Sequence, residues 1–433
     1  MGELEVDFKF HNVGQGLFYT GRLKYGRASF NFVYDCGSEK KPLVEDAIDR
    51  EFQHNDHINL LVISHLHDDH ISGVPYLLKR TNVDTVLLPY LSPLERLIVA
   101  LQTPDAPIEI YRFLADPVGF LRENGVNKIV FIGGLEPDRK ENWLSTSDIP
   151  PELPPNGEFI IDLERLPNDE ILRSEIKKLE PNVVGDRRVL VKNHSGVLPV
   201  KVKSKLVTKF PIWFFRLFNY KVSPRILAQF ENCIKGVLGN IETETIKDAI
   251  LNKNKRDDLK NKCYNNLSKR LRRDFNNTSL IVLHLPAFRP RVIYSWCECD
   301  WWLCCPLCLG CWPCYPHIKR RSRIISSNFV QFLTGDINLK YRFNEISQHF
   351  GLETVVNNTI VTLVPHHGSH KNWNNALCNN ITSNFWVVSA GIRNKYSHPS
   401  CQVLWNIRTN CHDSCVVWVN ETTYFRLMGV LEF

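Results

Sequence analysis

The chain has 433 residues, of which 43% are apolar and 23% charged, as in an ordinary soluble globular protein. It is long enough for one large domain with insertions or for two or three smaller ones. No apolar run is long enough to cross a bilayer as a helix, and the first residues, M-G-E-L-E-V-D-F, lack the pattern of a secretory signal. We therefore expect a cytoplasmic protein with no transmembrane segment.

The charge is unevenly distributed along the chain. Residues 187–273 hold 21 Lys or Arg against 6 Asp or Glu, a local net charge of +15, whereas the whole chain carries only +7. A basic segment in an otherwise acidic protein favours contact with a polyanion such as nucleic acid. Solvated helix faces produce the same charge pattern about as often.

Strands and helices alternate over the first 132 residues. Residues 3–36 alternate in polarity, which predicts antiparallel strands. Beyond them, the apolar spacing predicts helices at 42–52, 74–79, 93–101 and 108–122, and strands at 60–63, 83–88 and 128–132. This alternation is typical of an α/β layered fold.

The second half begins with two segments of unusual composition. Residues 134–182 are rich in Pro, Glu and Asp, which predicts a loop or irregular excursion. The basic region that follows is strand-like over 189–220 and helical over 223–275. Its aromatic cluster, Trp213-Phe214-Phe215, is either a small core or a set of stacking platforms for bases. Further strands are predicted at 276–285, 329–333, 361–364 and 385–389.

The strongest local pattern is the stretch S-H-L-H-D-D-H-I-S-G, directly after the apolar strand at 60–63. It places His65, His67, Asp69 and His70 in the spacing H-x-H-x-D-H. Imidazole and carboxylate groups are the ligands that zinc and similar divalent ions prefer, and a catalytic site leaves one position open for water. The sequence therefore predicts a metal-binding loop at the end of a buried strand.

Other strands end in residues of the same kind. Asp35 follows one strand in D-C-G, Asp336 ends L-T-G-D, His366 and His367 stand in P-H-H-G-S-H, and His398 precedes Pro399. Strand ends that converge on one edge of a sheet are where α/β folds place their sites. We therefore expect these residues to lie near the H-x-H-x-D-H loop.

The ordered motifs H-N-V-G-Q-G, D-C-G, S-H-L-H-D-D-H-I-S-G, N-T-S-L, L-T-G-D, V-P-H-H-G-S and N-K-Y-S-H-P resemble the metallo-β-lactamase superfamily. They are most similar to the branch that contains the C-terminal domain of the DNA-uptake protein ComEC. The resemblance implies an α/β fold, a four-layer αββα sandwich, formed by residues 1–185 and 274–433. It also implies a basic, largely helical insertion at 186–273 and a Cys-rich hairpin insertion at 296–323.

The resemblance further implies a site for two divalent metal ions, zinc or manganese. His65 and His67 would hold the first ion, Asp69 and His70 the second, and Asp336 would bridge them. Either His366 or His367 would complete the second site, and the residues alone do not decide between them. Asp69 could also orient the nucleophile, His398 would contact phosphate or act as a general acid, and Asp35 would orient a ligand histidine.

One ligand of the superfamily pattern has no clear counterpart. Many members supply another histidine to the first metal, and the candidates here are His194 and His284. Neither stands in a recognisable motif, and His284 is better explained as a core or surface imidazole. The first site is therefore expected to be more open and less selective between zinc and manganese.

Seven cysteines fall between Cys297 and Cys314. The C-x-x-C spacing of Cys305, Cys308, Cys311 and Cys314 suits a structural zinc or an iron–sulfur cluster. An apolar tip that contacts a protein partner or a membrane surface, and redox-linked thiols, are the alternatives. Because the strand at 329–333 carries Asp336 at its other end, we expect this Cys-rich tip to project away from the metal site.

The motifs and the basic region together predict a metal-dependent phosphodiesterase, a nuclease acting on DNA or RNA. Hydrolysis of a small phosphodiester, such as a cyclic nucleotide or a phosphocholine-type ester, would use the same ligands. A non-catalytic scaffold of the same fold is a third reading, although such proteins usually lose ligands.

Overall fold

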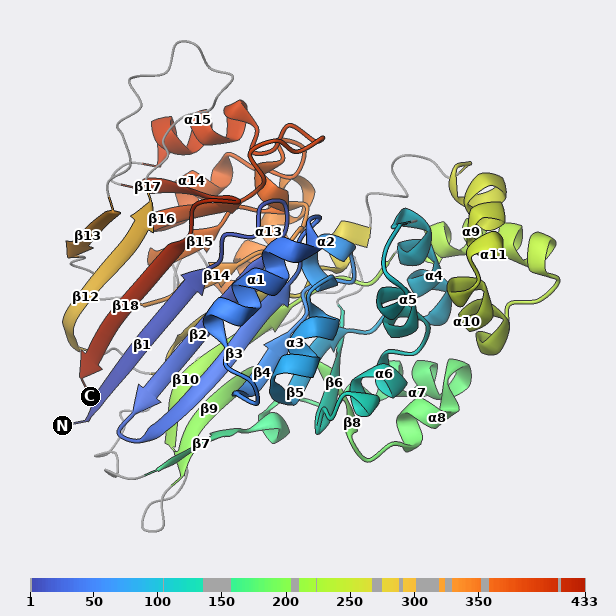
Figure 1. Cartoon of the computed structure of the whole chain (residues 1–433), viewed down its shortest axis with the longest axis horizontal. Coiled ribbons are helices and arrows are strands. Elements are labelled where there is room, and N and C mark those ends of the chain that lie inside the picture. Colours follow the sequence, from blue (N-terminus) through green and yellow to red (C-terminus); the bar gives the residue numbers. More distant parts are fainter. Residues whose placement is uncertain are drawn as a thin grey trace.

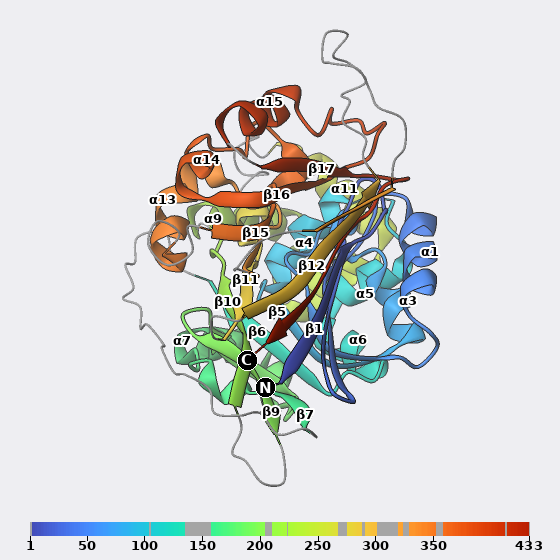
Figure 2. The same ribbon diagram turned by 90° about the vertical axis from the view of Figure 1, so that its left-hand side faces the viewer.

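The computed structural model describes residues 2–103, 105–134, 157–203, 210–222, 224–266, 275–287, 291–300, 319–323, 329–351, 358–411 and 414–432. Two β-sheets pack face to face, and helices cover the outer face of each sheet (Figure 1, Figure 2). The chain therefore forms a four-layer αββα sandwich, and the predicted fold class is confirmed.

The first sheet is mixed, and its strands lie in the order β13, β12, β18, β1, β2, β3, β4, β5, β6, β8. Their bounds are β1 (Glu3–Phe10), β2 (Phe18–Tyr25), β3 (Ala28–Cys36), β4 (His57–Val62), β5 (Asn82–Pro89), β6 (Lys128–Gly133), β8 (Val189–Asn193), β12 (Arg291–Asp300), β13 (Lys319–Arg323) and β18 (Phe425–Glu432). The strands from β3 to β8 are parallel, so their carboxyl ends share one edge. β4 is largely apolar because helices cover one of its faces and the second sheet covers the other.

The second sheet has the strand order β17, β16, β15, β14, β11, β10, β9, β7. Its members are β7 (Glu158–Ile161), β9 (Val197–Lys203), β10 (Phe210–Phe218), β11 (Ile281–Pro286), β14 (Gln331–Leu333), β15 (Asn358–Leu363), β16 (Thr382–Ser389) and β17 (Cys415–Val419). The strands β14 to β17 are parallel. The segments that follow β14, β15 and β16 therefore leave the sheet at the same edge.

The helices form the two outer layers. The first sheet is covered by α1 (Lys41–Glu51), α3 (Val74–Arg80), α4 (Pro93–Gln102), α5 (Ile108–Ala115) and α6 (Pro117–Glu123), and the second by α13 (Leu339–Phe350), α14 (Ala376–Asn380) and α15 (Cys401–Asn410) (Figure 2). The remaining helices are α2 (Asp68–Ile71), α7 (Glu170–Leu179), α8 (Pro181–Gly185), α9 (Pro224–Leu238), α10 (Thr243–Leu251) and α11 (Lys253–Leu259), with short turns η1 (Leu163–Arg165), η2 (Lys260–Tyr264), η3 (Phe275–Thr278) and η4 (His366–Gly368).

The predicted start of the basic insertion at residue 186 is wrong. β8, β9 and β10 belong to the two core sheets, so the helical segment outside them is α9 to η2. Trp213 and Phe215 are buried between the sheets, where the ring of Phe215 meets that of Phe32 edge-on at 5.0 Å. These two aromatic side chains are therefore core residues and cannot stack on bases.

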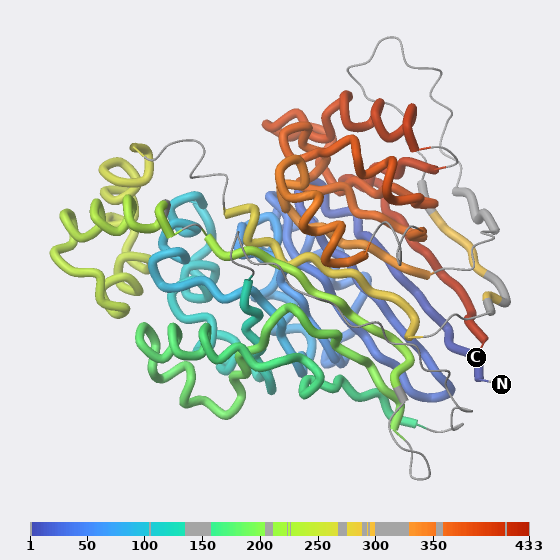
Figure 3. Tube along the Cα trace, turned by 180° about the vertical axis from the view of Figure 1, so that it is seen from behind, coloured from blue at the N-terminus to red at the C-terminus, as the bar shows by residue number. Residues whose placement is uncertain are grey.

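The helices α9 to α11 extend the helical layer over the first sheet. Their apolar side chains, including Phe230, Ile246 and Ile250, join the same core as α4 and α5. The guanidinium of Arg256 lies 3.6 Å from the ring centroid of Tyr111 on α5. Figure 3 shows this segment at the side of the molecule, next to the chain of α4 and α5. It therefore has no core of its own.

Two further predictions differ from the structure. The stretch predicted as an excursion at 134–182 contains the strand β7, the helix α7 and the start of α8. The helix predicted at 108–122 is divided into α5 and α6 at Pro117, which has no backbone N–H to continue α5. A carboxylate oxygen of Asp116 accepts a hydrogen bond from Gly119 N at 3.0 Å and caps the new helix.

The four cysteines of the predicted structural metal site, Cys305, Cys308, Cys311 and Cys314, lie outside the described residues. The strands that flank them, β12 and β13, form a hairpin on the edge of the first sheet. Cys299 of β12 is aligned with Phe425 of β18, which is aligned with Phe10 of β1. β1 leads from Phe10 into the loop before β2, where Leu17 N donates to Asp69 O, so β12 runs toward the sheet edge that carries the predicted ligands. The Cys-rich tip itself, residues 301–318, lies outside the described residues, and its predicted projection away from the metal site stays a prediction.

Among the described residues, two disulfides tie helices together. Cys233 on α9 is bonded to Cys263 in η2, and Cys378 on α14 is bonded to Cys411, which follows α15. Neither pair had a sequence signal. Among the described residues, no helix combines the length and the apolar character that a membrane crossing requires.

A chain of polar side chains crosses the core between the sheets. Trp213 Nε1 donates to His284 Nδ1 at 3.2 Å, so His284 Nε2 carries the proton and donates to the Tyr19 hydroxyl at 2.9 Å. Tyr19 in turn donates to Gln331 Oε1 at 2.9 Å. Both nitrogens of His284 are thus occupied, and burial lowers the pKa of this imidazole to about 3. His284 is a core residue.

This burial makes stability depend on pH. Between about pH 6.5 and 3 the unfolded chain protonates His284 while the folded chain does not, so stability falls as the pH falls. His284→Gln keeps a donor and an acceptor but cannot titrate. Urea unfolding measures the free energy of unfolding at pH values between 6.5 and 4.5. We expect this free energy to fall less steeply with falling pH in the variant than in the wild type, by up to about 1.4 kcal/mol per pH unit. Equal slopes in both proteins would contradict this assignment.

Candidate metal centre

The predicted ligands come from both sheets and meet at the shared edge. His65 and His67 follow β4, Asp69 and His70 lie on α2, Asp336 follows β14 and His367 lies in η4 after β15. The edge is closed by backbone contacts, since Leu280 N donates to Ser64 O at 2.7 Å and His366 N donates to Gly335 O at 3.1 Å. Residues nearly three hundred positions apart therefore share one site.

Three groups of these side chains have the geometry to hold a metal ion. They are His65, His67 and Asp336; His65, Asp69 and His70; and His70, Asp336 and His367. In each group the candidate ligand atoms lie within 4.8 Å of one another. Asp336 belongs to two groups, which is the position predicted for the bridging carboxylate.

Asp35 fixes the orientation of two of the histidines. Its fully buried carboxylate accepts from Ser64 N and from Ser64 Oγ, both at 2.6 Å, and from His70 Nδ1 at 2.8 Å. Because Ser64 Oγ donates to Asp35, it accepts from His65 Nδ1 at 3.0 Å. In both His65 and His70 the Nδ1 proton is therefore engaged, and Nε2 is turned toward Asp336.

His367 is oriented in the same way by a backbone group. Its Nδ1 lies 2.6 Å from Ser389 O, and because a carbonyl can only accept, Nδ1 carries the proton. Its Nε2 faces the carboxylates of Asp69 at 3.1 Å and Asp336 at 3.7 Å. A lone pair facing two carboxylates requires a proton or a metal ion between them.

His67 presents the other ring nitrogen. Its Nε2 lies 2.5 Å from Gln102 Oε1 at the end of α4, and since the amide oxygen accepts, Nε2 is the donor. The nitrogen left for a metal is therefore Nδ1. Gln102 had no signal in the sequence, because it stands at the end of an ordinary amphipathic helix.

The donor set fits a divalent ion. Nε2 of His65 and of His70 are buried and have no hydrogen-bond partner among the described residues, although they face Asp336 at 3.7 and 3.3 Å. Buried polar nitrogens without partners are costly unless something else satisfies them. Imidazole nitrogens and carboxylate oxygens at this spacing are ligands typical of zinc and of manganese.

The electrostatics of the cluster also favour a bound cation. Asp35, Asp69 and Asp336 are gathered around the same imidazoles. Burial opposes the charged form of His70, yet Asp336, Asp35 and Asp69 raise the pKa of this imidazole well above its usual value. Burial would likewise raise the pKa of Asp336, but His366, His367 and His70 hold it well below its usual value. The cluster therefore needs positive charge, as protons or as metal ions.

His366 differs from its neighbour. Its side chain is 24% exposed, and its Nδ1 accepts from Asn276 Nδ2 at 2.7 Å. It lies 3.5 Å from Asp336, but it belongs to none of the three metal-holding groups. Of the two histidines that the sequence left open, the geometry therefore favours His367 as the ligand.

Backbone geometry brings these residues together. Asp35, His366 and His367 have positive φ angles of 56°, 47° and 54°, a strained conformation for residues other than Gly. Gly37 makes room for the ligand helix, because a Cβ there would lie 2.4 Å from His70 N. This contact explains the D-C-G motif, in which Asp35 orients His70 and Gly37 lets α2 approach.

The N-N-T-S-L segment joins the two halves of the site. Asn276 contacts His366, and Ser279 Oγ accepts from Asp336 N at 3.1 Å. These roles were not predicted, although the segment was noted as a motif. His194 and His284, the candidates for an additional ligand, belong to none of the metal-holding groups. His194 Nδ1 instead contacts Gly133 O at 2.8 Å.

His398 lies at the rim of the centre. Its ring is 5.5 Å from that of His366 and 5.7 Å from that of Tyr396. Burial, together with the neighbouring His367 and His366, lowers the pKa of His398 to about 3. The imidazole is therefore neutral at pH 7 and can donate or accept a hydrogen bond there.

Comparison with known proteins agrees with this geometry over part of the chain. Residues 26–123 match the family model of the metallo-beta-lactamase superfamily, a range that runs from the turn before β3 to the end of α6 and includes the H-x-H-x-D-H loop. No curated protein matches the chain. The match covers His65, His67, Asp69 and His70, whereas Asp336 and His367 join them through the fold.

The two neighbouring histidines provide an internal comparison for metal binding. We expect His367→Gln to lower the amount of zinc or manganese retained after gel filtration, because Nε2 of His367 faces both carboxylates. His366→Gln should retain the wild-type amount, since its Nδ1 is turned to Asn276. Elemental analysis of the purified proteins measures both, and the reverse order would contradict the assignment.

Asp35 should act on metal affinity without touching the ion. Asp35→Asn keeps the shape but loses the acceptor that holds both Ser64 and His70, so we expect metal affinity about 10- to 100-fold weaker. Asp49→Asn, which removes the same charge from the surface of α1, is the control. Competition with a fluorescent chelator gives both affinities, and an unchanged value for Asp35→Asn would show that the histidines need no such support.

Proposed function

We propose that the protein is a metal-dependent phosphodiesterase that cleaves nucleic acid. The observation that carries this proposal is the pair of metal-holding groups that share Asp336, with Nε2 of His65 and of His70 turned toward it. The match of residues 26–123 to the metallo-beta-lactamase superfamily supports a hydrolase. The intact ligand set counts against a scaffold that has lost catalysis.

The metal-holding residues would form two sets of ligands. His65, His67 and Asp336 would hold one ion, and Asp69, His70, His367 and Asp336 the other. Two divalent ions, zinc or manganese, supply a nucleophilic water at neutral pH and stabilise charge on the phosphoryl oxygens. Asp69, which faces His367 at 3.1 Å, would also accept a hydrogen bond from the attacking water.

His398 and Asn276 stand where a substrate phosphate would approach. Both line a cleft that reaches the centre at His366. A neutral imidazole can donate a hydrogen bond to a phosphate oxygen, which favours this role for His398. A general acid would need a pKa nearer the working pH, so we assign His398 to phosphate contact.

Asp336 provides the direct test. Asp336→Asn should lower metal-dependent cleavage of DNA, RNA and a small phosphodiester by about 100-fold or more, because it removes the shared carboxylate from both groups. It should also lower the metal content below that of the wild type. Asp257→Asn, an exposed change on α11, is the control for net charge.

The proposal fails if the wild type, loaded with Zn²⁺ or Mn²⁺, cleaves no phosphodiester. It also fails if Asp336→Asn cleaves as fast as the Asp257→Asn control. Gel analysis of labelled single- and double-stranded DNA and RNA, with a chromogenic ester in parallel, gives these rates.

A further inference from the structure

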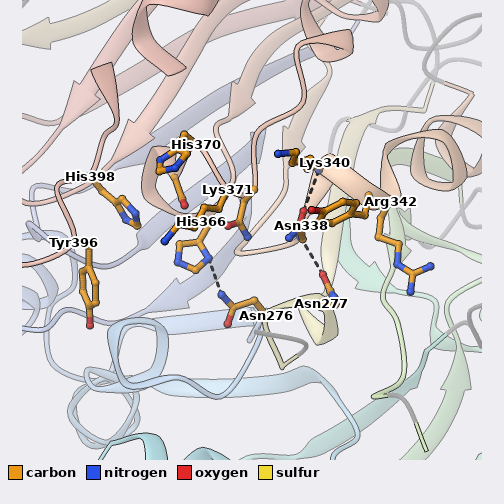
Figure 4. Close-up of a pocket in the computed structure, with 13 residues that line it drawn as sticks. Asn276, Asn277, Asn338, Lys340, Arg342, His366, His370, Lys371, Tyr396 and His398 are labelled. Atoms are coloured by element: carbon orange, nitrogen blue, oxygen red, sulfur yellow. Dashed lines mark hydrogen bonds between the residues drawn. The ribbon is translucent and has the colours of Figure 1, made fainter. Parts of the chain in front are cut away.

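A large cleft adjoins the candidate metal centre and is lined by the start of α13 and by the segments that follow β15 and β16. It has a volume of about 1240 Å³ and meets the centre at His366 and Asn276. Figure 4 shows Tyr396 and His398 at one end, His366 in the middle, and Lys340 and Arg342 at the other end. This volume exceeds the roughly 300–1,000 Å³ typical of small-molecule pockets. A small phosphodiester would leave most of it empty.

The cleft is lined by positive and neutral side chains. Lys340 and Arg342 come from the first turn of α13, and Lys371 follows the η4 turn. None of its described lining residues is acidic. Lys340 and Lys371 are exposed, whereas Arg342 lies 3.4 Å from Glu345 and over the ring of Tyr220. The two lysines are therefore the charges most available to a ligand.

A second opening, which adjoins the cleft and contains the metal-holding residues His67, Asp69, Asp336 and His367, has the opposite character. It has a volume of about 490 Å³ and is lined by Glu39, Asp68 and Asp105 in addition to metal-holding residues. Its cation, Lys395, lies 3.3 Å from Glu39. The positive charge that a polyanion would meet next to the centre therefore comes from the cleft on the α13 side.

Two exposed tyrosines line the cleft. Tyr341 is 76% exposed and Tyr396 is 49% exposed. Exposed aromatic rings beside a basic groove are the features that bind unpaired bases, because every base has a face that can stack. A duplex would keep its bases away from these rings.

We propose that this cleft binds a single-stranded nucleic acid, with Lys340 and Lys371 on its phosphates and Tyr341 stacking on a base. The inference rests on the proposed phosphodiesterase function and names its substrate class. It assigns the nucleic-acid contact to the cleft and not to the basic helices α9 to α11. These helices contribute none of the described lining residues of either opening. The strand would run from α13 past His366 to the metal centre.

Binding can be tested separately from cleavage. The probe is a fluorescein-labelled 20-nucleotide oligo(dT), titrated with protein in EDTA and followed by anisotropy at several salt concentrations. Lys340→Gln/Lys371→Gln should make the slope of log affinity against log salt shallower by about 1.4, which corresponds to about 25-fold weaker binding at 0.1 M salt. Tyr341→Ala should weaken binding about fivefold or more.

The matched control carries the same charge change on the helical segment. Lys235 on α9 and Lys253 on α11 are both exposed, so Lys235→Gln/Lys253→Gln should bind the oligonucleotide within about twofold of the wild type. Equal losses in the two double variants would overturn the proposal, as would unchanged binding in Lys340→Gln/Lys371→Gln. Tighter binding of a duplex of the same length would also overturn it.

Cleavage then separates this inference from the proposed function. With Mn²⁺ present, the loss of kcat/KM in Lys340→Gln/Lys371→Gln should be at least tenfold larger on the oligonucleotide than on bis(p-nitrophenyl) phosphate. Equal losses on both substrates overturn the cleft assignment and leave the phosphodiesterase in place. If the wild type cleaves neither substrate, the proposed function fails.

Discussion

The candidate centre depends on how the two sheets are joined at one edge. Leu280 N of the second sheet donates to Ser64 O at the end of the first, and the Tyr34 hydroxyl donates to Leu280 O at 3.0 Å. Ser64 also links the buried carboxylate of Asp35 to His65. The same few residues therefore hold the sheets together and set the direction of the imidazoles. A shift at this edge would separate Asp336 from the histidines it faces.

The ligands of the H-x-H-x-D-H loop could be predicted because they lie close together in the sequence. His65, His67, Asp69 and His70 come from one loop and one helical turn, and Asp336 and His367 were found because each follows a strand. The choice between His366 and His367 could not be made, because it depends on two successive positive φ angles and on the partners Asn276 and Ser389. Gln102 reaches His67 from a helix end that carries no pattern.

The insertions were the least predictable part of the fold. The basic composition of 186–273 suggested one module, but composition does not show where a strand is paired. β8, β9 and β10 lie in two sheets, and Trp213 fills the core between them. Among the described residues, the lysines that line the cleft beside the centre, Lys340 and Lys371, come instead from α13 and from the segment after η4. Net charge along the sequence therefore did not show which basic side chains line the cleft.

Crystallographic anomalous scattering shows whether two metal ions share Asp336. Crystals soaked in Zn²⁺ would be measured on both sides of the zinc absorption edge. We expect two anomalous peaks, one among His65, His67 and Asp336 and the other among Asp69, His70, His367 and Asp336. A single peak, or no peak beside Asp336, would show that the carboxylate is not shared by two ions.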